Sequence, residues 1–444
     1  MKYAEAIDYL LSFADFERSG RFQDRPDVVP MRTLLKELGD PHLGRVTVHI
    51  AGSKGKGSTA AMIESILRAA GHKTGLFTSP HLDDFTERIR IDGEPIAQPA
   101  FARLTEELRP AVERGLALVH DRSFVTFDLL TALGFMAFSE AGIHTQVIEV
   151  GLGGRVDSTN VFDTKEVAVI TPLSYEHTAI LGDDIEHIAA EKAAIITPGC
   201  TVVLAPQEFT AAKAVVLQRA ADVNACVVDS ANTYRSNVRS HDLQRQAIEI
   251  ETPSGNFDVA LPLLGRHQAE NAVTAVAVAQ RLGADDAAII RGLENVVWPA
   301  RFEVLREHPL VIADGAHNRE SARRLRETLV EYAGSSRVTF VIGSSSDKDV
   351  EGVAAELAPI AERVFPARSR SPRAMDPERI AEAFRGAGAS VEDVDTVPAA
   401  LELALAATDE SGVICLAGSL FVAAEGREHL KTRNGKPLEA IDGR

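Results

Sequence analysis

The sequence predicts an α/β protein with a largely parallel sheet and two domains. Short apolar runs of strand length alternate with helical patterns almost throughout the chain, as in proteins whose helices connect parallel strands. At 444 residues the chain exceeds the length that one hydrophobic core usually supports. Proline ends a helical pattern near residues 297–301, so we expect domains at 1–297 and 298–444.

The individual elements follow from periodicity. Residues 246–263 alternate apolar and polar side chains around the turn Pro253–Asn256, which predicts an antiparallel hairpin appended to the main sheet. The expected strands are 45–51, 73–78, 145–150, 167–171, 310–313, 338–342, 362–365 and 413–417, and the expected N-terminal helices are 1–18 and 30–38.

Composition excludes several classes of protein. Hydrophobic residues make up 45% and charged residues 25%, and no apolar run approaches the ~18 residues of a membrane helix. The N-terminus lacks a signal peptide's apolar centre, and three widely spaced cysteines fit reduced thiols. A net charge of −17 argues against nucleic-acid binding, since phosphate backbones require a basic surface. We therefore expect a cytoplasmic protein without nucleic-acid or membrane partners.

The segment 45–59 carries the strongest functional pattern. An apolar run ends at a loop in which glycines surround two lysines, and a helical pattern begins at Ser58. Backbone N–H groups freed by glycine, a helix N-terminus and a lysine together form a cradle for phosphate. The alternative is a glycine-rich turn with solvated lysines. The residues of this nucleotide loop are Gly52, Lys54, Gly55, Lys56, Gly57 and Ser58.

The loop departs from the common P-loop, because Lys56 is followed by Gly57 rather than by Ser or Thr. Other blocks recur along the chain: Thr78–Leu82, Glu87–Ile89, Glu149–Val161, Glu191–Ala193, Gly265–Gln268 with Asn271, Asp314–Asn318, Asp347–Asp349 and Gly418–Leu420. Together these blocks resemble the folylpolyglutamate synthase/dihydrofolate synthase family of the Mur ligase superfamily, in family order over roughly residues 45–425. In that family's loop an Asn stands where this chain has Lys54.

The resemblance implies a P-loop-containing N-terminal domain with a mostly parallel sheet and a smaller Rossmann-like C-terminal domain. It also implies an ATP- and Mg²⁺-dependent ligase that adds L-glutamate to dihydropteroate or a reduced folate through an acyl phosphate. A monomer is expected. The sequence leaves open whether the enzyme makes dihydrofolate, extends polyglutamate, or does both.

Candidate metal ligands lie at predicted strand ends. Glu149 ends one strand and Ser79 follows another, and ligands gather at the carboxyl ends of parallel strands. Mg²⁺ needs few protein ligands beside phosphate oxygens and water. The resemblance implies that Ser79 and Glu149 bind one Mg²⁺, and that His177 and Lys192 bind a second. The alternatives are a solvated glutamate and a surface histidine.

Lys192 falls on the apolar face of a predicted helix at 183–196, together with Ile185 and Ile188. Desolvation lowers the pKa of an amine, and a neutral lysine can react with carbon dioxide to form a carbamate. The resemblance implies that Lys192 is carbamylated and is catalytic together with Lys56 and His177. The alternative is a lysine that extends from a partly buried face to solvent.

The resemblance assigns the remaining candidates to two ligands. On the nucleotide side they are Asn271, Arg301, Asp314 and His317. On the substrate side they are Val125, Thr126, Phe127 and Asp128, then Val156, Asp157 and Ser158, with Ser419 near the incoming glutamate. In the plainer alternative, Phe127 is a core residue and Arg301 is a solvated residue at the domain junction.

Two other functions remain possible from sequence. A cell-wall Mur ligase would carry a further N-terminal domain, whereas 44 residues precede the nucleotide-loop strand here. A non-catalytic P-loop switch would leave a second α/β domain unexplained, and the guanine motif Asn-Lys-x-Asp is absent from the sequence.

Overall fold

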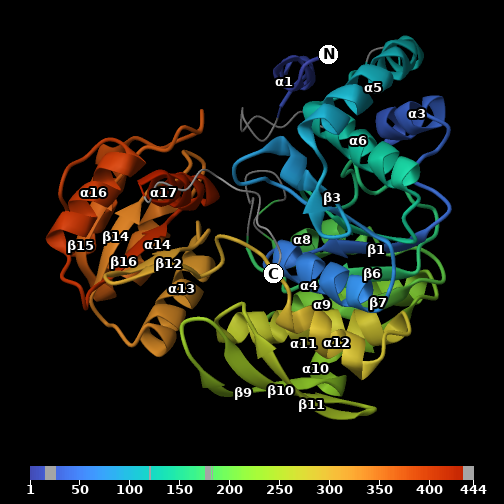
Figure 1. The fold of residues 1–444 in the computed structure, drawn as a ribbon. Helices are drawn as coiled ribbons and strands as arrows, with labels where there is room; N and C mark the ends of the chain where they lie inside the picture. The colour runs from blue at the N-terminus through green and yellow to red at the C-terminus, as the bar shows by residue number, and fades with distance from the viewer. Residues whose placement is uncertain (16–26, 120–121, 176–181, 183, 434–444) are drawn as a thin grey trace.

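The computed structural model describes residues 1–15, 27–119, 122–175, 182 and 184–433. Two lobes, each with its own sheet, lie side by side (Figure 1). Residues of both lobes line a cleft between them. This architecture confirms the predicted α/β class. No helix in the described parts of the chain is long and apolar enough to cross a membrane.

The N-terminal lobe is built on an eight-stranded sheet in the order β4-β3-β2-β5-β1-β6-β7-β8. Pairing is parallel from β2 to β8, while β3 and β4 are antiparallel additions at one edge. The carboxyl ends of β1, β5 and β2 therefore meet at one edge of the sheet. The strands are β1 (Val46–Ala51), β2 (Thr74–Phe77), β3 (Ile89–Ile91), β4 (Glu94–Pro95), β5 (Thr145–Glu149), β6 (Val167–Ile170), β7 (Thr201–Leu204) and β8 (Cys226–Asp229).

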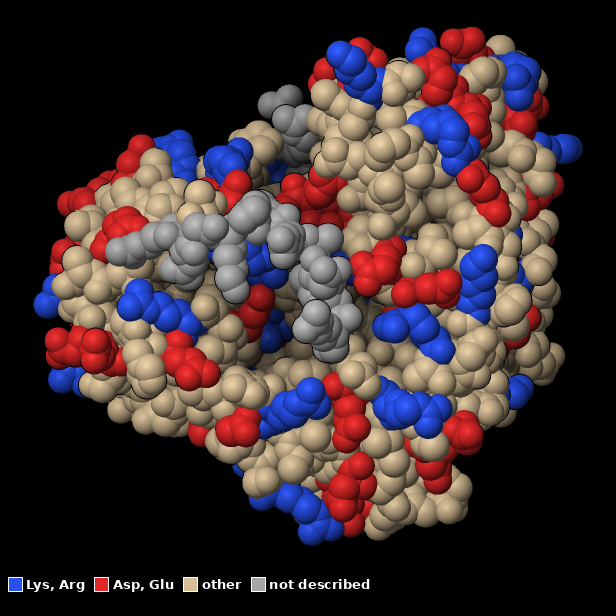
Figure 2. All heavy atoms as spheres, in the orientation of Figure 1, with Lys and Arg blue, Asp and Glu red and all other residues tan. Residues whose placement is uncertain are grey.

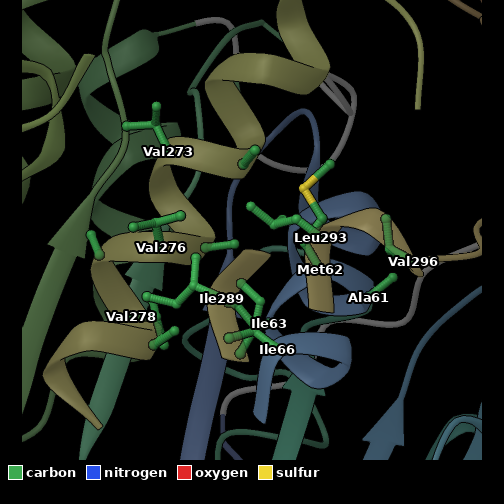
Figure 3. Packing of buried hydrophobic residues seen from close by; sticks show 14 of the residues in the cluster. Ala61, Met62, Ile63, Ile66, Val273, Val276, Val278, Ile289, Leu293 and Val296 are labelled. Carbon is green, nitrogen blue, oxygen red and sulfur yellow. The ribbon is translucent and has the colours of Figure 1, made fainter. Parts of the chain in front are cut away.

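Successive strand residues point to opposite faces of this sheet, and each face has its own core. On one face α4 packs with α11 and α12, where Ile63 and Ile66 meet Ile289 and Val276 (Figure 3). The other face is covered by two helical groups, one before β5 and one after β6. The helices of this lobe are α1 (Tyr3–Leu11), α3 (Val29–Glu37), α4 (Lys56–Ala69), α5 (Gln98–Leu118), α6 (Thr126–Ala141), α8 (Ile185–Ala193), α9 (Thr210–Asp222), α10 (Ser230–Thr233), α11 (Arg266–Arg281) and α12 (Asp286–Glu294).

The predicted hairpin forms, but its predicted attachment was wrong. β10 (Gln246–Thr252) and β11 (Gly255–Leu261) pair with β9 (Arg235–His241) in a separate three-stranded sheet. Their alternating apolar residues pack on α11 and α12 rather than beside the main sheet. Alternation predicted a half-buried sheet correctly, but it carries no information about which element covers the apolar face.

The C-terminal lobe has a five-stranded sheet in the order β12-β13-β16-β14-β15, parallel except for β12. The junction proposed at residues 297–301 lies between the last helix of the first lobe and β12. The elements are β12 (Glu303–Glu307), β13 (Leu310–Ala313), β14 (Val338–Ile342), β15 (Ala361–Pro366) and β16 (Val413–Ala417), with α13 (Arg319–Tyr332), α14 (Val350–Leu357), α15 (Pro377–Gly386), α16 (Val397–Ala407) and α17 (Leu420–Arg433).

Contacts on two sides fix the lobes to each other. On one side the Tyr332 hydroxyl donates to Gln246 Oε1 at 2.7 Å, and the Tyr332 ring stacks on His241 with centroids 4.0 Å apart. On the other side Arg427 of α17 lies 3.5 Å from Asp83 of the first lobe, and Glu303 of its own lobe holds it at 2.8 Å. Polar contacts therefore join the lobes in addition to the chain that connects them.

The contact between α4 and α12 requires a glycine. A Cβ on Gly292 would overlap the backbone of Ile66. We predict that Gly292→Ala lowers the free energy of unfolding by about 2–3 kcal/mol, because the two helices must move apart. Chemical denaturation measures this loss. Gly386→Ala is the control, since nothing lies within 4 Å of a Cβ at Gly386, and its stability should be unchanged or up to about 1 kcal/mol higher. Equal stabilities would contradict the packing argument.

Candidate active site

A cavity of about 2250 Å³ lies between the lobes, and the space-filling view shows the molecule hollowed there (Figure 2). Both lobes contribute to its wall, which brings together residues from widely separated parts of the sequence. The sequence-predicted residues that line it are Lys54, Gly55, Lys56, Gly57, Ser58, Ser79, Val125, Thr126, Phe127, Glu149, Val156, Asp157, Ser158, Asn271, Arg301, Asp314, His317 and Ser419. His177 lies outside the described residues.

The nucleotide loop is packed too closely for side chains at its glycines. A Cβ on Gly52 would collide with Thr171, and one on Gly55 would lie 2.5 Å from Asn271 Oδ1. Gly55 caps α4 in the left-handed region, at φ +76°, so the helix begins at Lys56, two residues earlier than predicted. Ser58 consequently lies inside the first turn of the helix, whose N-terminus faces the cavity.

Lys192 is buried, as its position on the apolar face predicted, and it points at the nucleotide loop. Its Nζ donates to the carbonyl oxygen of Gly52 at 3.0 Å. Lys56 Nζ donates to the same oxygen, also at 3.0 Å. Two ammonium groups that share one carbonyl oxygen repel each other. The glycine-rich turn after β5 packs closely against α8, the helix that carries Lys192, since a Cβ on Gly154 would lie 2.6 Å from the Glu191 carbonyl.

Glu149 lies at the carboxyl end of β5 and is almost fully buried. Burial raises its pKa to about 7, although Lys56, Arg301 and Arg88 act in the opposite direction. One of its oxygens accepts the N–H of Ser79 at 3.2 Å. A desolvated carboxylate beside a hydroxyl suits a hard cation such as Mg²⁺. The described residues contain no cluster of three His, Cys, Asp or Glu side chains, so phosphate oxygens and water would complete such a site.

Two predicted substrate residues hold loops beside the cavity; Asp157 also lines its wall, whereas Asp128 lies outside the lining. Asp128 is fully buried, accepting the Ser158 hydroxyl at 2.7 Å and the Val125 N–H at 2.9 Å. Asp157 accepts the N–H groups of Leu152 and Thr159, at 2.9 and 3.0 Å. Both carboxylates therefore fix the backbone around the cavity.

Phe127 is only partly buried and packs 5.9 Å from the ring of Phe77. A Cβ on Gly151 would lie 2.6 Å from Phe127 Cζ, so the ring also contacts the glycine turn after β5. Phe127 therefore belongs to the core cluster and also presents an aromatic surface to the cavity. The two interpretations of this residue are compatible.

The second lobe presents its candidates at the end of β13. Asp314 accepts the N–H groups of Phe302 and Ala316, each at 2.8 Å, and burial raises its pKa. His317 Nδ1 lies 2.9 Å from the Gly315 carbonyl. Because a carbonyl only accepts, Nδ1 carries the proton in this hydrogen bond.

Sequence reasoning missed three residues of the cavity wall. Arg88 is buried, its Nε donates to His81 Nδ1 at 2.8 Å, and it acts electrostatically on Glu149. Gln268 bonds Asn271 at 3.0 Å and Ser58 at 3.4 Å, which joins α11 to the nucleotide loop. Trp298 lies in the linker between the lobes, residues 297–301, and packs against this loop. Arg88 and Gln268 did lie in two of the family blocks, Glu87–Ile89 and Gly265–Gln268, but the proximity of Arg88 to Glu149 depends on the fold.

These features define a two-domain α/β protein with a phosphate-binding loop that opens into the cleft between the domains. Residues 115–279 match the Mur ligase middle domain, and residues 300–420 match the glutamate ligase domain of Mur ligases. Together with full-length relatives above 30% identity, these matches place the chain in the folylpolyglutamate synthase/dihydrofolate synthase family of the Mur ligase superfamily.

The relatives cover nearly the whole chain. It is 32% identical to the dihydrofolate synthase/folylpolyglutamate synthase of Bacillus subtilis over 421 residues, 93% of this chain and 96% of that protein. It is 38% identical over 435 residues, 96% of this chain, to a probable bifunctional folylpolyglutamate synthase/dihydropteroate synthase of Haloferax volcanii, but it spans only 50% of that protein's length. The structure superposes on Mycobacterium tuberculosis folylpolyglutamate synthase complexed with ADP and AMPPCP with a TM-score of 0.88 and 31% identity, covering 99% and 100% of the two chains.

The position of Lys56 predicts a role in nucleotide affinity. Lys56→Ala should weaken ADP binding about 10- to 100-fold, because a charge-assisted bond to phosphate is lost. Isothermal calorimetry measures this, with Lys73→Ala as the control, since Lys73 is an exposed lysine outside the cavity wall. An unchanged dissociation constant at an unchanged melting temperature would show that the loop does not bind phosphate.

Proposed function

We propose that the protein is an ATP-dependent ligase that joins a pteroate or folate carboxylate to the amine of L-glutamate. One observation carries the proposal: Lys56, Glu149 and Arg301, from both lobes, line a single cavity in a chain of this family. The superposed relative, which is complexed with ADP and AMPPCP, supports ATP as the nucleotide. The named relatives favour this function over a cell-wall ligase or a non-catalytic switch.

The chemistry proceeds in two steps. A substrate carboxylate attacks the γ-phosphate of ATP, which gives an acyl phosphate and ADP. The glutamate amine then adds to the acyl carbon, and inorganic phosphate leaves as the amide forms. The first step brings two anionic groups together, so its barrier falls when Lys56 and Arg301 neutralise their repulsion. The lobes supply positioning rather than a protein nucleophile.

Ser79 and Glu149 fit a Mg²⁺ bound to the phosphates, for the reasons of burial and ligand chemistry given above. Mg²⁺ in this place supplies positive charge to the phosphate oxygens. His177 and Lys192 would hold a second ion. In this proposal Glu149 must be ionised, and the surrounding cations favour its ionised form.

Lys192 acts as a carbamate in this proposal. Its ammonium would otherwise share the Gly52 carbonyl with Lys56 in a buried site. Addition of carbon dioxide to the neutral amine, with loss of a proton, gives a carbamate anion that a metal ion can stabilise. Burial and metal binding therefore support the same modification.

The remaining residues divide between the substrates. Phe127 offers an aromatic surface to a pteridine or benzoyl ring, and the Val125–Asp128 and Val156–Ser158 segments position it. Asn271 binds on the adenine side, Asp314 and His317 also bind on the nucleotide side, and Ser419 lies toward the incoming glutamate. The enzyme acts as a cytoplasmic monomer, and the free thiols of its three cysteines support a reducing location.

The proposed reaction predicts phosphate release that depends on L-glutamate. ATP with Mg²⁺ and glutamate should be tested with 7,8-dihydropteroate, tetrahydrofolate and a UDP-sugar peptide acceptor, with product mass as the readout. We expect amide formation, one ADP per bond, with at least one pteridine acceptor. Turnover only with the UDP-sugar peptide would support the cell-wall alternative, and no turnover with any acceptor would support the switch.

The carbamate predicts a specific pattern of rescue at Lys192. Lys192→Ala should lose activity at least about 100-fold, and a short carboxylic acid in solution should restore part of it. Lys192→Arg keeps the charge but cannot form this carbamate, so it should stay inactive. Steady-state rates with and without acetate measure both effects. An active arginine variant would show that positive charge suffices.

A further inference from the structure

The linker between the lobes holds the chain's single tryptophan against the nucleotide loop. A Cβ built on Gly57 would lie 3.1 Å from Cζ2 and 3.3 Å from Nε1 of Trp298, closer than side chains normally approach. Gly57 is also the position at which the loop departs from the common P-loop. The departure therefore leaves room for the linker to touch the residue that follows Lys56.

Packing rather than hydrogen bonding holds this indole. Among the described residues Trp298 Nε1 is buried without a hydrogen-bond partner. The guanidinium carbon of Arg90 lies 5.7 Å from the indole centroid, within cation–π distance. Arg90 is itself fixed to the Gly93 carbonyl at 3.2 Å. The indole thus contacts both the nucleotide loop and β3, and movement of the loop changes its surroundings.

The linker backbone beyond the indole is strained. Ala300 and Phe302 adopt φ angles of +56° and +49°, a left-handed region that is unfavourable for residues with a Cβ. Three hydrogen bonds hold this conformation. The N–H of Ala300 donates to Glu303 at 2.9 Å, the N–H of Phe302 donates to Asp314, and the N–H of Gly315 donates to the Ala300 carbonyl at 3.0 Å.

Arg301 lies between the two left-handed residues and is thereby turned into the cavity. Its charge acts on Glu149 in one lobe and on Asp314 in the other. A Cβ on Gly315 would lie 2.8 Å from Arg301 Nη1, so the backbone at Gly315 packs closely against the guanidinium. A small movement of the linker would therefore displace a charge that acts on both lobes.

We propose that Trp298 is a positioning residue that transmits nucleotide binding at Lys56 and Gly57 through the strained linker to Arg301. The contact with Gly57 fixes the position of Trp298 at the start of the linker. The left-handed conformations of Ala300 and Phe302 then fix the position of the Arg301 side chain. The inference rests on the proposed binding of nucleotide at the loop. It adds a residue that acts on the reaction through Arg301.

Because the chain has one tryptophan, the fluorescence emission of the wild-type protein reports on the surroundings of Trp298. Titration with ADP should change Trp298 emission saturably, with the dissociation constant that calorimetry gives. Lys56→Ala should show no change at the same ADP concentrations. Constant emission while calorimetry shows bound ADP would overturn the proposal and leave the proposed function standing. An absence of ADP binding by calorimetry would overturn both.

Kinetics separate positioning from a merely structural role. Trp298→Leu should keep the ADP dissociation constant within about threefold and lower the kcat of glutamate ligation about tenfold, with KM for ATP little changed. Gly57→Ala should lower kcat by itself, yet cost little more in the Trp298→Leu background, because the same contact is already lost. Independent, multiplicative effects would overturn the proposal, as would an unchanged kcat in Trp298→Leu.

Val297→Ala is the matched control, since Val297 is the preceding linker residue and is 57% exposed. It should retain both the emission change and the kcat of the wild type. A loss of kcat equal to that of Trp298→Leu would show that the linker responds to any substitution, which would overturn the specific role of the indole.

Discussion

The carbonyl oxygen of Gly52 is the point on which the site depends. Gly52 directly follows β1, a strand in the interior of the main sheet, and its carbonyl oxygen accepts hydrogen bonds from both Lys56 and Lys192. One lysine belongs to the helix that follows the loop and the other to α8, so this oxygen joins two elements about 140 residues apart in sequence. Lys56, Lys192 and a buried carboxylate, Glu149, are thereby brought together at one edge of the sheet. Such a balance of charge suits a reaction between anions.

Close backbone contact is the second constraint. Gly55 allows Asn271 to lie against the nucleotide loop, and Gly292 allows α12 to pack on α4. Gly154 allows the turn after β5 to pack on α8. Each contact removes space that a side chain would need, so the phosphate-binding loop is shaped by the helices around it. Rigidity of this kind keeps backbone N–H groups aimed without a bound ligand.

The two lobes are connected by more than the linker. Tyr332 reaches Gln246 on one side, while Arg427 reaches Asp83 on the other. The partly exposed pairs contribute little to stability by themselves, but they set the relative orientation of the cavity walls. Arg301 acts on carboxylates of both lobes, so a change in that orientation would alter the electrostatic interaction of Arg301 with Glu149 or Asp314.

The sequence by itself determined the α/β class, the nucleotide loop, the strand-end position of Glu149 and the burial of Lys192. These features depend on local periodicity and on glycine spacing, which operate over a few residues. Only the tertiary structure decided that Lys192 and Lys56 share one carbonyl, that Asp128 is buried behind the cavity, and that the hairpin belongs to a separate sheet. It also placed Arg88 near Glu149 and Trp298 against Gly57. These contacts join residues far apart in the chain, and the packing of whole elements creates them, so no local pattern records them.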